Sequence, residues 1–75
     1  MCEMEAYLLI KTGGGKAKEI LKKIKEIKGV TEANGVYGSV DIIAKIKGDD
    51  LASLVVDEIR RIDGVIDTNT LIIAL

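Results

Sequence analysis

An internal repeat is the feature of this sequence that most constrains its fold. Seven positions of the first half match the residue type found 35 positions later. They are Gly13 with Gly48, Ala17 with Ala52, Ile24 with Ile59, Ile27 with Ile62, Gly29 with Gly64, Val30 with Val65, and Asn34 with Asn69. Self-similarity of this kind indicates one supersecondary unit used twice. We therefore expect two similar halves that join near residues 36–43.

Each half places apolar residues at helical spacing between two strand-like runs. These helical positions are Ala17, Ile20, Leu21, Ile24 and Ile27 in the first half, and Ala52, Val55, Val56, Ile59 and Ile62 in the second. Gly29 and Gly64 follow, and glycine readily ends a helix in the left-handed conformation. The carboxylates of Asp49-Asp50 suit the start of the second helix, because they can cap it and favour its positive dipole end. The pattern predicts helices over residues 16–28 and 50–62.

Four short runs have strand character, over residues 6–10, 30–37, 40–46 and 65–75. Gly38 and Ser39 can supply the two central residues of a hairpin between the second and third strands. A helix between two strands makes a right-handed crossover between parallel strands. The doubled unit therefore predicts an α+β fold, the ferredoxin-like βαββαβ sandwich. We expect a four-stranded antiparallel sheet in the order 4-1-3-2, with both helices on one face.

The alternation of side chains along a strand predicts which residues face outward. In the second strand it puts Val30 and Glu32 on one face and Thr31 and Ala33 on the other. Elsewhere apolar residues occupy both faces: Leu8 and Ile10 oppose Tyr7 and Leu9, and Leu71 and Ile73 oppose Ile72 and Ala74. A bare face of this kind would expose an apolar patch that monomers rarely tolerate. The sequence therefore predicts a homodimer that forms through the sheet.

The composition excludes several classes of function. The 11 basic and 12 acidic side chains nearly cancel, so the chain lacks the positive field that gathers nucleic acid or an anionic membrane. Histidine is absent and Cys2 is the only cysteine, so we expect no disulfide, metal or cofactor. The N-terminal stretch of residues 1–5 is acidic and is not followed by a long apolar run, so we expect neither a secretory signal nor a membrane span there. We expect one cytoplasmic domain over residues 1–75.

Two stretches could hold an anion. Gly13-Gly14-Gly15-Lys16 lies between a strand and a helix, where backbone N–H groups and a lysine could hold phosphate. A small phosphate-handling enzyme that uses this loop is one alternative. The stretch lacks P-loop spacing, and three glycines also make an ordinary connector. The lysines that follow form a basic surface, made of Lys18, Lys22, Lys23 and Lys25. RNA-binding sheets of this topology display stacking aromatic side chains, whereas Tyr7 and Tyr37 are the only aromatics here, so we expect a solvated helix face. No nucleophile has a visible base partner, so we expect no enzyme.

Two further stretches carry candidate ligand-binding groups. The hairpin offers Tyr37, the backbone of Gly38-Ser39, Val40 and the carboxylate of Asp41. Thr68-Asn69-Thr70 brings three polar side chains into an otherwise apolar last strand. An unpaired carboxylate at Asp41 would be costly to cover. Turn chemistry and solvation of a strand edge account for the same residues without a ligand.

Both stretches resemble a known family. Residues 37–43, Tyr-Gly-Ser-Val-Asp-Ile-Ile, resemble the Gly-x-x-Asp hairpin of the Lrp/AsnC effector-binding domain, also called the RAM domain. Residues 62–70 resemble the closing stretch of that family, in which a Pro-Gly-Val-like turn leads to Thr-x-Thr. The resemblance spans nearly the whole chain. Asp63 stands where proline is common, and Val40 where an aromatic residue often sits.

The resemblance implies a domain that dimerises through its sheets, assembles into rings, often octamers, and binds small effectors such as amino acids between dimers. Gly38, Ser39, Val40 and Asp41 would line the pocket, with Asp41 on the ammonium group, and Thr68, Asn69 and Thr70 at the other end. Full-length members place a DNA-reading helix-turn-helix first, for which this chain has no room. The expected function is amino-acid sensing that modulates transcription without direct DNA contact. The alternative is a ligand-free module that co-assembles with full-length Lrp/AsnC regulators.

Overall fold

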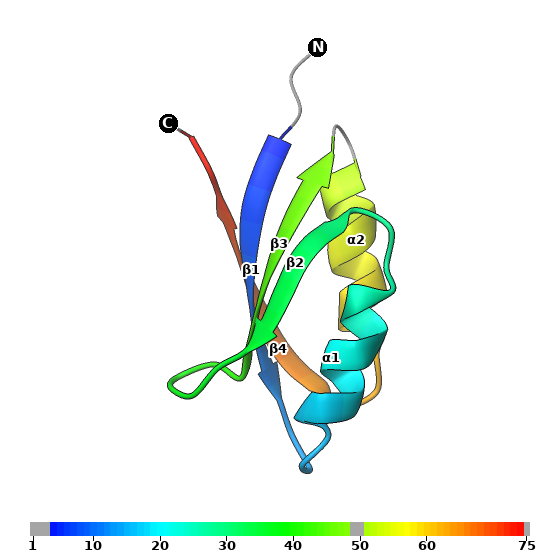
Figure 1. Ribbon diagram of the computed structural model, residues 1–75, viewed down its shortest axis with the longest axis vertical. Coiled ribbons are helices and arrows are strands. Elements are labelled where there is room, and N and C mark those ends of the chain that lie inside the picture. The colour runs from blue at the N-terminus through cyan, green and yellow to red at the C-terminus, as the bar shows by residue number, and fades with distance from the viewer. Residues whose placement is uncertain (1–3, 49–50, 75) are drawn as a thin grey trace.

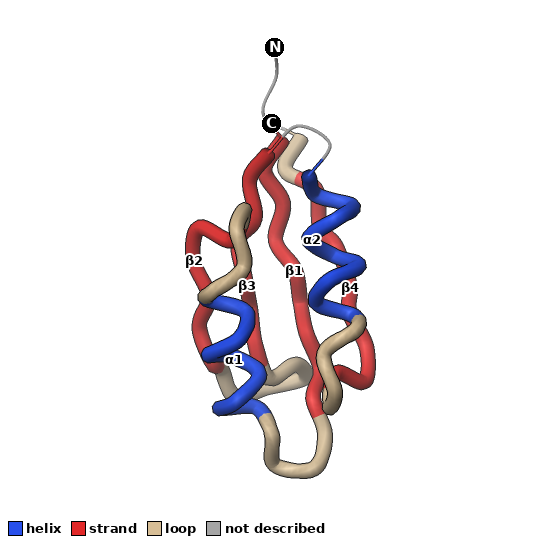
Figure 2. Tube along the Cα trace, turned by 90° about the vertical axis from the view of Figure 1, so that its right-hand side faces the viewer, coloured by secondary structure: helices blue, strands red, loops and turns tan. Residues whose placement is uncertain are grey.

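The computed structural model describes residues 4–48 and 51–74. Its elements are β1 (Met4–Thr12), α1 (Ala17–Lys25), β2 (Val30–Gly35), β3 (Ile42–Gly48), α2 (Leu51–Arg60) and β4 (Val65–Ile72). The strands form one layer and the helices lie side by side in a second layer on one face of the sheet (Figures 1 and 2). The expectations for Cys2 and for an Asp49-Asp50 helix cap concern residues outside the described part.

The sheet has the predicted topology. Its strand order is β2-β3-β1-β4, which is the expected order 4-1-3-2 read from the other edge. Every neighbouring pair is antiparallel, and β3 lies between the parallel strands β1 and β2. The ferredoxin-like fold is therefore confirmed, and β4 is an edge strand.

The core lies between the helices and one face of the sheet. Ile24 of α1 and Ile59 of α2, which match in the repeat, are both completely buried. The other core residues are Ala6, Leu8, Ile10, Ile20, Ala33, Ile42, Ala44, Ile46 and Val55. Burying one of the large aliphatic side chains contributes about 1.5–3 kcal/mol. Among the described residues the core contains no buried polar side chain.

Both helices end earlier than predicted, and a tight turn fills the gap. The first stops at Lys25, and the Ile27 N–H donates to the Ile24 carbonyl at 3.1 Å. The second repeats this turn after Arg60, with the Ile62 N–H donating to Ile59 at 3.1 Å. These bonds span three residues, a spacing that tightens helix ends. Gly29 and Gly64 then reverse the chain at φ values of +103° and +100°, in the left-handed region as expected.

A bulge in β2 makes the predicted faces of the second strand wrong, and β4 contains a matching bulge. The pairing of β2 with β3 skips Thr31, so Val30 lies opposite Ile46 and Glu32 opposite Lys45. Val30 therefore shares the helix-facing side with Ala33, contrary to strict alternation. The pairing of β4 with β1 skips Ile66, the residue that matches Thr31 in the repeat. An extra residue shifts the alternation by one, which a period of two cannot anticipate.

The repeat also slips by one residue between the strands and the helices. Helix positions keep the offset of 35, as in Ile24 and Ile59, but the buried residues of β1 and β3 match at 36, as in Leu8 and Ala44. The stretch from a buried strand position to its matching helix position is therefore one residue shorter in the second half, 15 residues from Ala44 to Ile59 against 16 from Leu8 to Ile24. As a result Gly13 and Gly48, which match in sequence, do not occupy equivalent places in the fold. Gly48 is the last residue of β3, whereas Gly13 follows the end of β1.

The predicted two-residue hairpin is wrong. β2 ends at Gly35 and β3 begins at Ile42, so residues 36–41 form a six-residue loop. The Val36 N–H donates to the Asp41 carbonyl at 2.8 Å and closes this loop at its base. The Asp41 N–H donates to the Ile10 carbonyl of β1 at 3.0 Å, one residue out of the β1–β3 register, in which Ile10 lies opposite Ile42. The neighbouring strand, rather than a tight turn, decides where β3 begins.

The outer face of the sheet is mixed rather than uniformly apolar. An apolar strip crosses it, made of Tyr7, Leu9, Ile43, Leu71 and Ile73. The side chains of Tyr7, Leu71 and Ile73 are 39%, 48% and 38% exposed, so a second protein surface that packed on this face would bury apolar area. Charged side chains border the strip, with the Lys45 ammonium 5.7 Å from the Tyr7 ring centre and Lys47 4.0 Å from Glu5.

Gly64→Ala should destabilise the fold more than Gly14→Ala. A Cβ at residue 64 would lie 2.9 Å from Ile20 Cδ1 at a φ of +100°, whereas at residue 14 it would meet nothing within 4 Å at a φ of +66°. We expect Gly64→Ala to lower the free energy of unfolding by about 2–3 kcal/mol and Gly14→Ala by about 1 kcal/mol. Urea unfolding of both variants measures this, and equal losses would contradict the packing argument.

Candidate functional site

The loop of residues 36–41 projects from the end of the sheet, away from the helices (Figure 1). Its tip is open to solvent: Tyr37 is 107% exposed, and Gly38 and Ser39 are exposed as well. Val40 is half-buried. A loop in this position has few contacts within its own chain and is free to meet a ligand or a neighbouring copy.

Asp41 anchors the base of this loop to β1. Its Oδ2 accepts hydrogen bonds from the Thr12 N–H at 2.8 Å and from Thr12 Oγ1 at 3.2 Å. The carboxylate that was singled out as a ligand for an ammonium group is therefore already engaged within the chain. Both bonds use the same oxygen, so the anchor holds the loop in place without using the whole carboxylate.

The pleat of β4 separates the three polar residues of the last strand. Thr68 lies opposite Ile10 and Thr70 opposite Leu8, so both face the helix side. Asn69 lies opposite Leu9 on the outer face. Thr68 and Thr70 can therefore line one site together, but Asn69 cannot join them within one chain.

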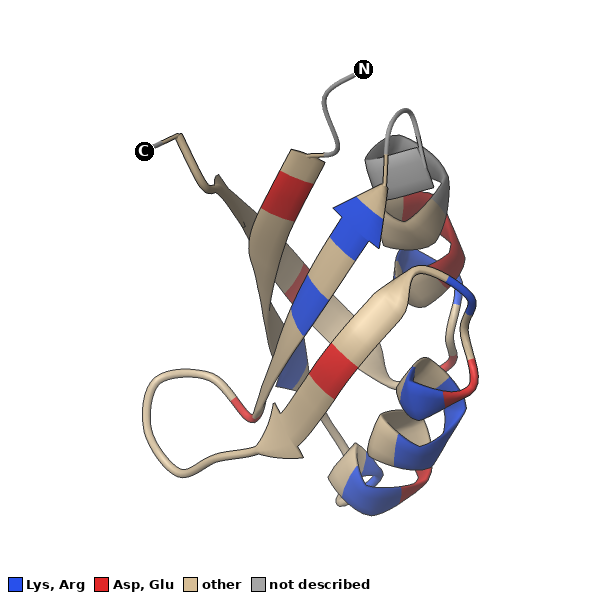
Figure 3. Ribbon diagram, turned by 45° about the horizontal axis from the view of Figure 1, so that its top comes forward, with Lys and Arg blue, Asp and Glu red and all other residues tan. Residues whose placement is uncertain are grey.

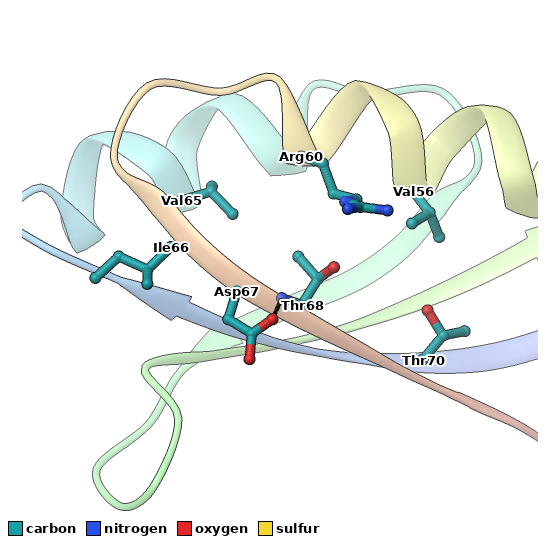
Figure 4. Close-up of a pocket in the computed structure, with 7 residues that line it drawn as sticks. All are labelled: Val56, Arg60, Val65, Ile66, Asp67, Thr68 and Thr70. Atoms are coloured by element: carbon teal, nitrogen blue, oxygen red, sulfur yellow. Dashed lines mark hydrogen bonds between the residues drawn. The ribbon is translucent and has the colours of Figure 1, made fainter.

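Two open cavities contain part of the predicted set. One of about 390 Å³ lies between the start of α1 and the loop, and its lining includes Tyr37 and Asp41 together with Lys18 and Leu21. The other, of about 350 Å³, lies between α2 and β4 (Figure 4). It is lined by Val56, Arg60, Val65, Ile66, Asp67, Thr68 and Thr70. Gly38, Ser39, Val40 and Asn69 line neither cavity.

Sequence reasoning missed Arg60, the one cationic side chain of the second cavity. Val56 and Arg60 are four residues apart and so lie on the same face of α2. Arg60 was overlooked because the helical pattern was used only to find apolar residues. The sequence did hold a signal for Arg60, which lies one helical turn after Val56 at the end of the second helix. The polar stretch Thr68-Asn69-Thr70 follows that helix and packs beside it in β4.

The stretch from Gly13 to Lys16 holds no free lysine. Lys16 Nζ forms a 2.7 Å ion pair with Asp63 Oδ2, although both side chains are exposed. Their hydrogen bond first, and their opposite charges second, lower the pKa of Asp63 and raise the pKa of Lys16. The charge that a phosphate would offset at this helix end therefore already has a partner within the chain. Figure 3 shows further Lys and Arg residues along α1, which carries Lys18, Lys22, Lys23 and Lys25, and others on the strands and α2.

Metal clusters and membrane-spanning helices are absent from the described part of the chain. Residues 4–48 and 51–74 contain no group of three or more metal-binding side chains. No helix there is long and apolar enough to cross a membrane.

Comparison with known proteins identifies the family. A family model described as the Lrp/AsnC ligand binding domain matches residues 5–74. The chain belongs to this family. The transcriptional regulator LysM of Sulfurisphaera tokodaii is 34% identical over 74 residues, covering 95% of this chain and 53% of that protein. The Lrp/AsnC domain thus spans about half the length of the curated relatives it matches.

Solved structures agree with the Lrp/AsnC assignment. FFRP-DM1 superposes with a TM-score of 0.86 at 32% identity, covering 95% of this chain and 99% of that one. Escherichia coli AsnC superposes with a TM-score of 0.84 at 25% identity, covering 96% of this chain and 51% of that one. The curated relatives are transcriptional regulators, and this chain corresponds to the ligand binding domain of that family.

Asp41→Ala should destabilise this Lrp/AsnC domain by about 1.5–3 kcal/mol, the usual worth of hydrogen bonds to a charged group. Thr12→Val keeps the backbone donor and removes only the longer bond, so it should cost about 1 kcal/mol. Urea unfolding measures both, and amide hydrogen exchange at Thr12 should accelerate only in Asp41→Ala. Equal stability of the Asp41→Ala variant and the wild type would show that the anchor is not needed.

Asp63→Asn should return the pKa of Lys16 toward its ordinary value, which a carbon NMR titration of the lysines can follow. The pair stabilises the fold between the ordinary pKa of aspartate and that of lysine. Its contribution is lost as pH falls through the lowered pKa of Asp63, and as pH rises through the raised pKa of Lys16. Asp57→Asn, on the exposed side of α2, is the control. A Lys16 titration that is identical in all three proteins would rule out the pair in solution.

Proposed function

We propose that this Lrp/AsnC domain senses an amino acid and, through its own assembly, modulates transcription without contacting DNA directly. The family match over residues 5–74 carries this proposal, because it covers nearly the whole chain and its description names ligand binding. The curated relatives are transcriptional regulators, which supports a regulatory rather than an enzymatic role, and we place the domain in the cytoplasm.

The shape of the chain supports a ligand site that is completed between copies. Tyr37, Gly38 and Ser39 lie exposed on a loop that projects from the sheet. Thr68 and Thr70 line a cavity that is open to solvent. A small ligand needs most of its surface buried for tight binding. A loop from a neighbouring copy could cover such a cavity and supply Val40 and Asp41 to its rim, with Asn69 near the contact.

The outer face of the sheet supports the assembly. The apolar strip runs over three strands, and Tyr7, Leu71 and Ile73 are each more than a third exposed, which suits burial against a second copy. Its charged border would set the register of the two sheets, because opposite charges favour one alignment. We propose a homodimer through this face and a ring of dimers, such as an octamer, with the effector between dimers.

A thermal-shift screen of the twenty amino acids tests the sensing role. At ten times its dissociation constant, a ligand stabilises the folded state by about 1.4 kcal/mol. In a domain of this size that raises the melting temperature by roughly 6–11 °C. Calorimetry on the hits should give the stoichiometry. The absence of any shift at millimolar concentrations would eliminate amino-acid sensing.

Tyr37→Ala tests whether the loop takes part in that site. The ring is fully exposed, so the variant should unfold like the wild type while binding the screened amino acid at least tenfold more weakly. Glu26→Ala changes an exposed residue at the end of α1 and is the matched control. Unchanged binding by Tyr37→Ala would remove the loop from the site.

The alternative is an assembly module that has no ligand and co-oligomerises with full-length Lrp/AsnC regulators. The openness of both cavities within one chain favours it. Sedimentation of this chain mixed with a full-length regulator separates the two functions. Mixed particles whose size does not change when amino acids are added support the assembly module. Particles whose size changes when an amino acid is added support the sensing role.

A further inference from the structure

The cavity between α2 and β4 has a built arrangement of donors. The guanidinium of Arg60 lies above the pair Thr68 and Thr70, on the helix side of β4 (Figure 4). These two threonines face the same side as the buried Leu8 and Ile10, yet α2 leaves Thr70 exposed and Thr68 only half-buried. One cation and two hydroxyls therefore meet at an edge that is open to small molecules.

Arg60 lacks a carboxylate partner in the described part of the chain, where no ion pair within 4.0 Å includes it. Asp67 is the one acidic residue in the lining, and Figure 4 shows it on the opposite side of β4 from Arg60. Its Oδ1 accepts the Thr68 N–H at 3.0 Å. A cation in the last turn of a helix is favoured by the dipole, but the adjacent Arg61 satisfies that preference equally and does not line the cavity.

The free edge of β4 adds a backbone donor. The Ile73 N–H donates to Glu5 of β1 at 2.9 Å, in register with the ladder. In an antiparallel ladder the residues bonded to the neighbour alternate, so Thr68 and Thr70 direct their backbone groups away from β1. The Thr68 N–H is taken by Asp67, which leaves the Thr70 N–H at the edge beside its own hydroxyl.

The planar guanidinium of Arg60 suits a carboxylate, because arginine binds carboxylates through two parallel hydrogen bonds. The hydroxyls of Thr68 and Thr70 and the Thr70 N–H are further donors for its oxygens. Val56, Val65 and Ile66 complete the lining and would contact a short aliphatic group. We propose that Arg60, with Thr68 and Thr70, binds the carboxylate of a small aliphatic acid. That this acid is the amino-acid effector rests on the proposed function.

Nitrogen–proton NMR titration with isobutyrate tests the site without knowledge of the effector. Isobutyrate should shift the amide signals of Thr68 and Thr70 in the wild type, and the uncharged isostere isobutyramide should not. Arg60→Gln should weaken isobutyrate binding at least tenfold. Arg61→Gln removes the same charge from the adjacent residue and should bind like the wild type. Arg60→Lys should fall between them, since it keeps the charge and loses the fork.

Equal isobutyrate binding by Arg60→Gln and Arg61→Gln would overturn the site, as would shifts confined to other residues or none in the wild type. Repeating the titration with the best amino acid from the screen separates the two proposals. Amino-acid binding that ignores Arg60→Gln refutes this inference and leaves the sensing role standing. Isobutyrate binding through Arg60 without any amino-acid binding supports the site and refutes amino-acid sensing.

Discussion

The position of β1 at the centre of the sheet is the constraint on which the rest of the structure depends. It pairs with β3 on one side and β4 on the other, and its inward residues Leu8 and Ile10 are completely buried under the helices. Its register with β4 decides that Thr68 and Thr70 face the helix side. Its end, at Thr12, holds Asp41 and so determines where the loop leaves the sheet. One strand thus positions both candidate regions.

The helices cover only one face of the sheet, which leaves the other face available for assembly. Two helices bury the inner face, and the outer face keeps an apolar strip bordered by charges. A chain of 75 residues has little core to spare, so burial of that strip in an assembly would add to stability as well as bring sites together. This links the fold directly to the proposed role, since an effector bound between copies would shift the assembly equilibrium by mass action.

The two candidate regions differ in how they are built. The loop of residues 36–41 is anchored at its base by the carboxylate of Asp41, and its tip at Tyr37, Gly38 and Ser39 is exposed. The cavity beside β4 is made of side chains on a helix and a strand, which are rigid supports. A carboxylate would therefore find Arg60, Thr68 and Thr70 on backbone that is fixed by a helix and a strand, whereas the loop is suited to close over a ligand that is already held.

The sequence by itself determined the repeat, the number and order of the elements and the buried helix positions, because hydrophobic periodicity depends on local spacing alone. It also determined the family, through the Gly-x-x-Asp and Thr-x-Thr stretches. Tertiary structure decided what depends on neighbouring strands: the bulges at Thr31 and Ile66, the six-residue loop, and the partner of Asp41. It also placed Arg60 beside Thr68, because the spacing that puts Arg60 one turn after Val56 does not record what that face of the helix packs against.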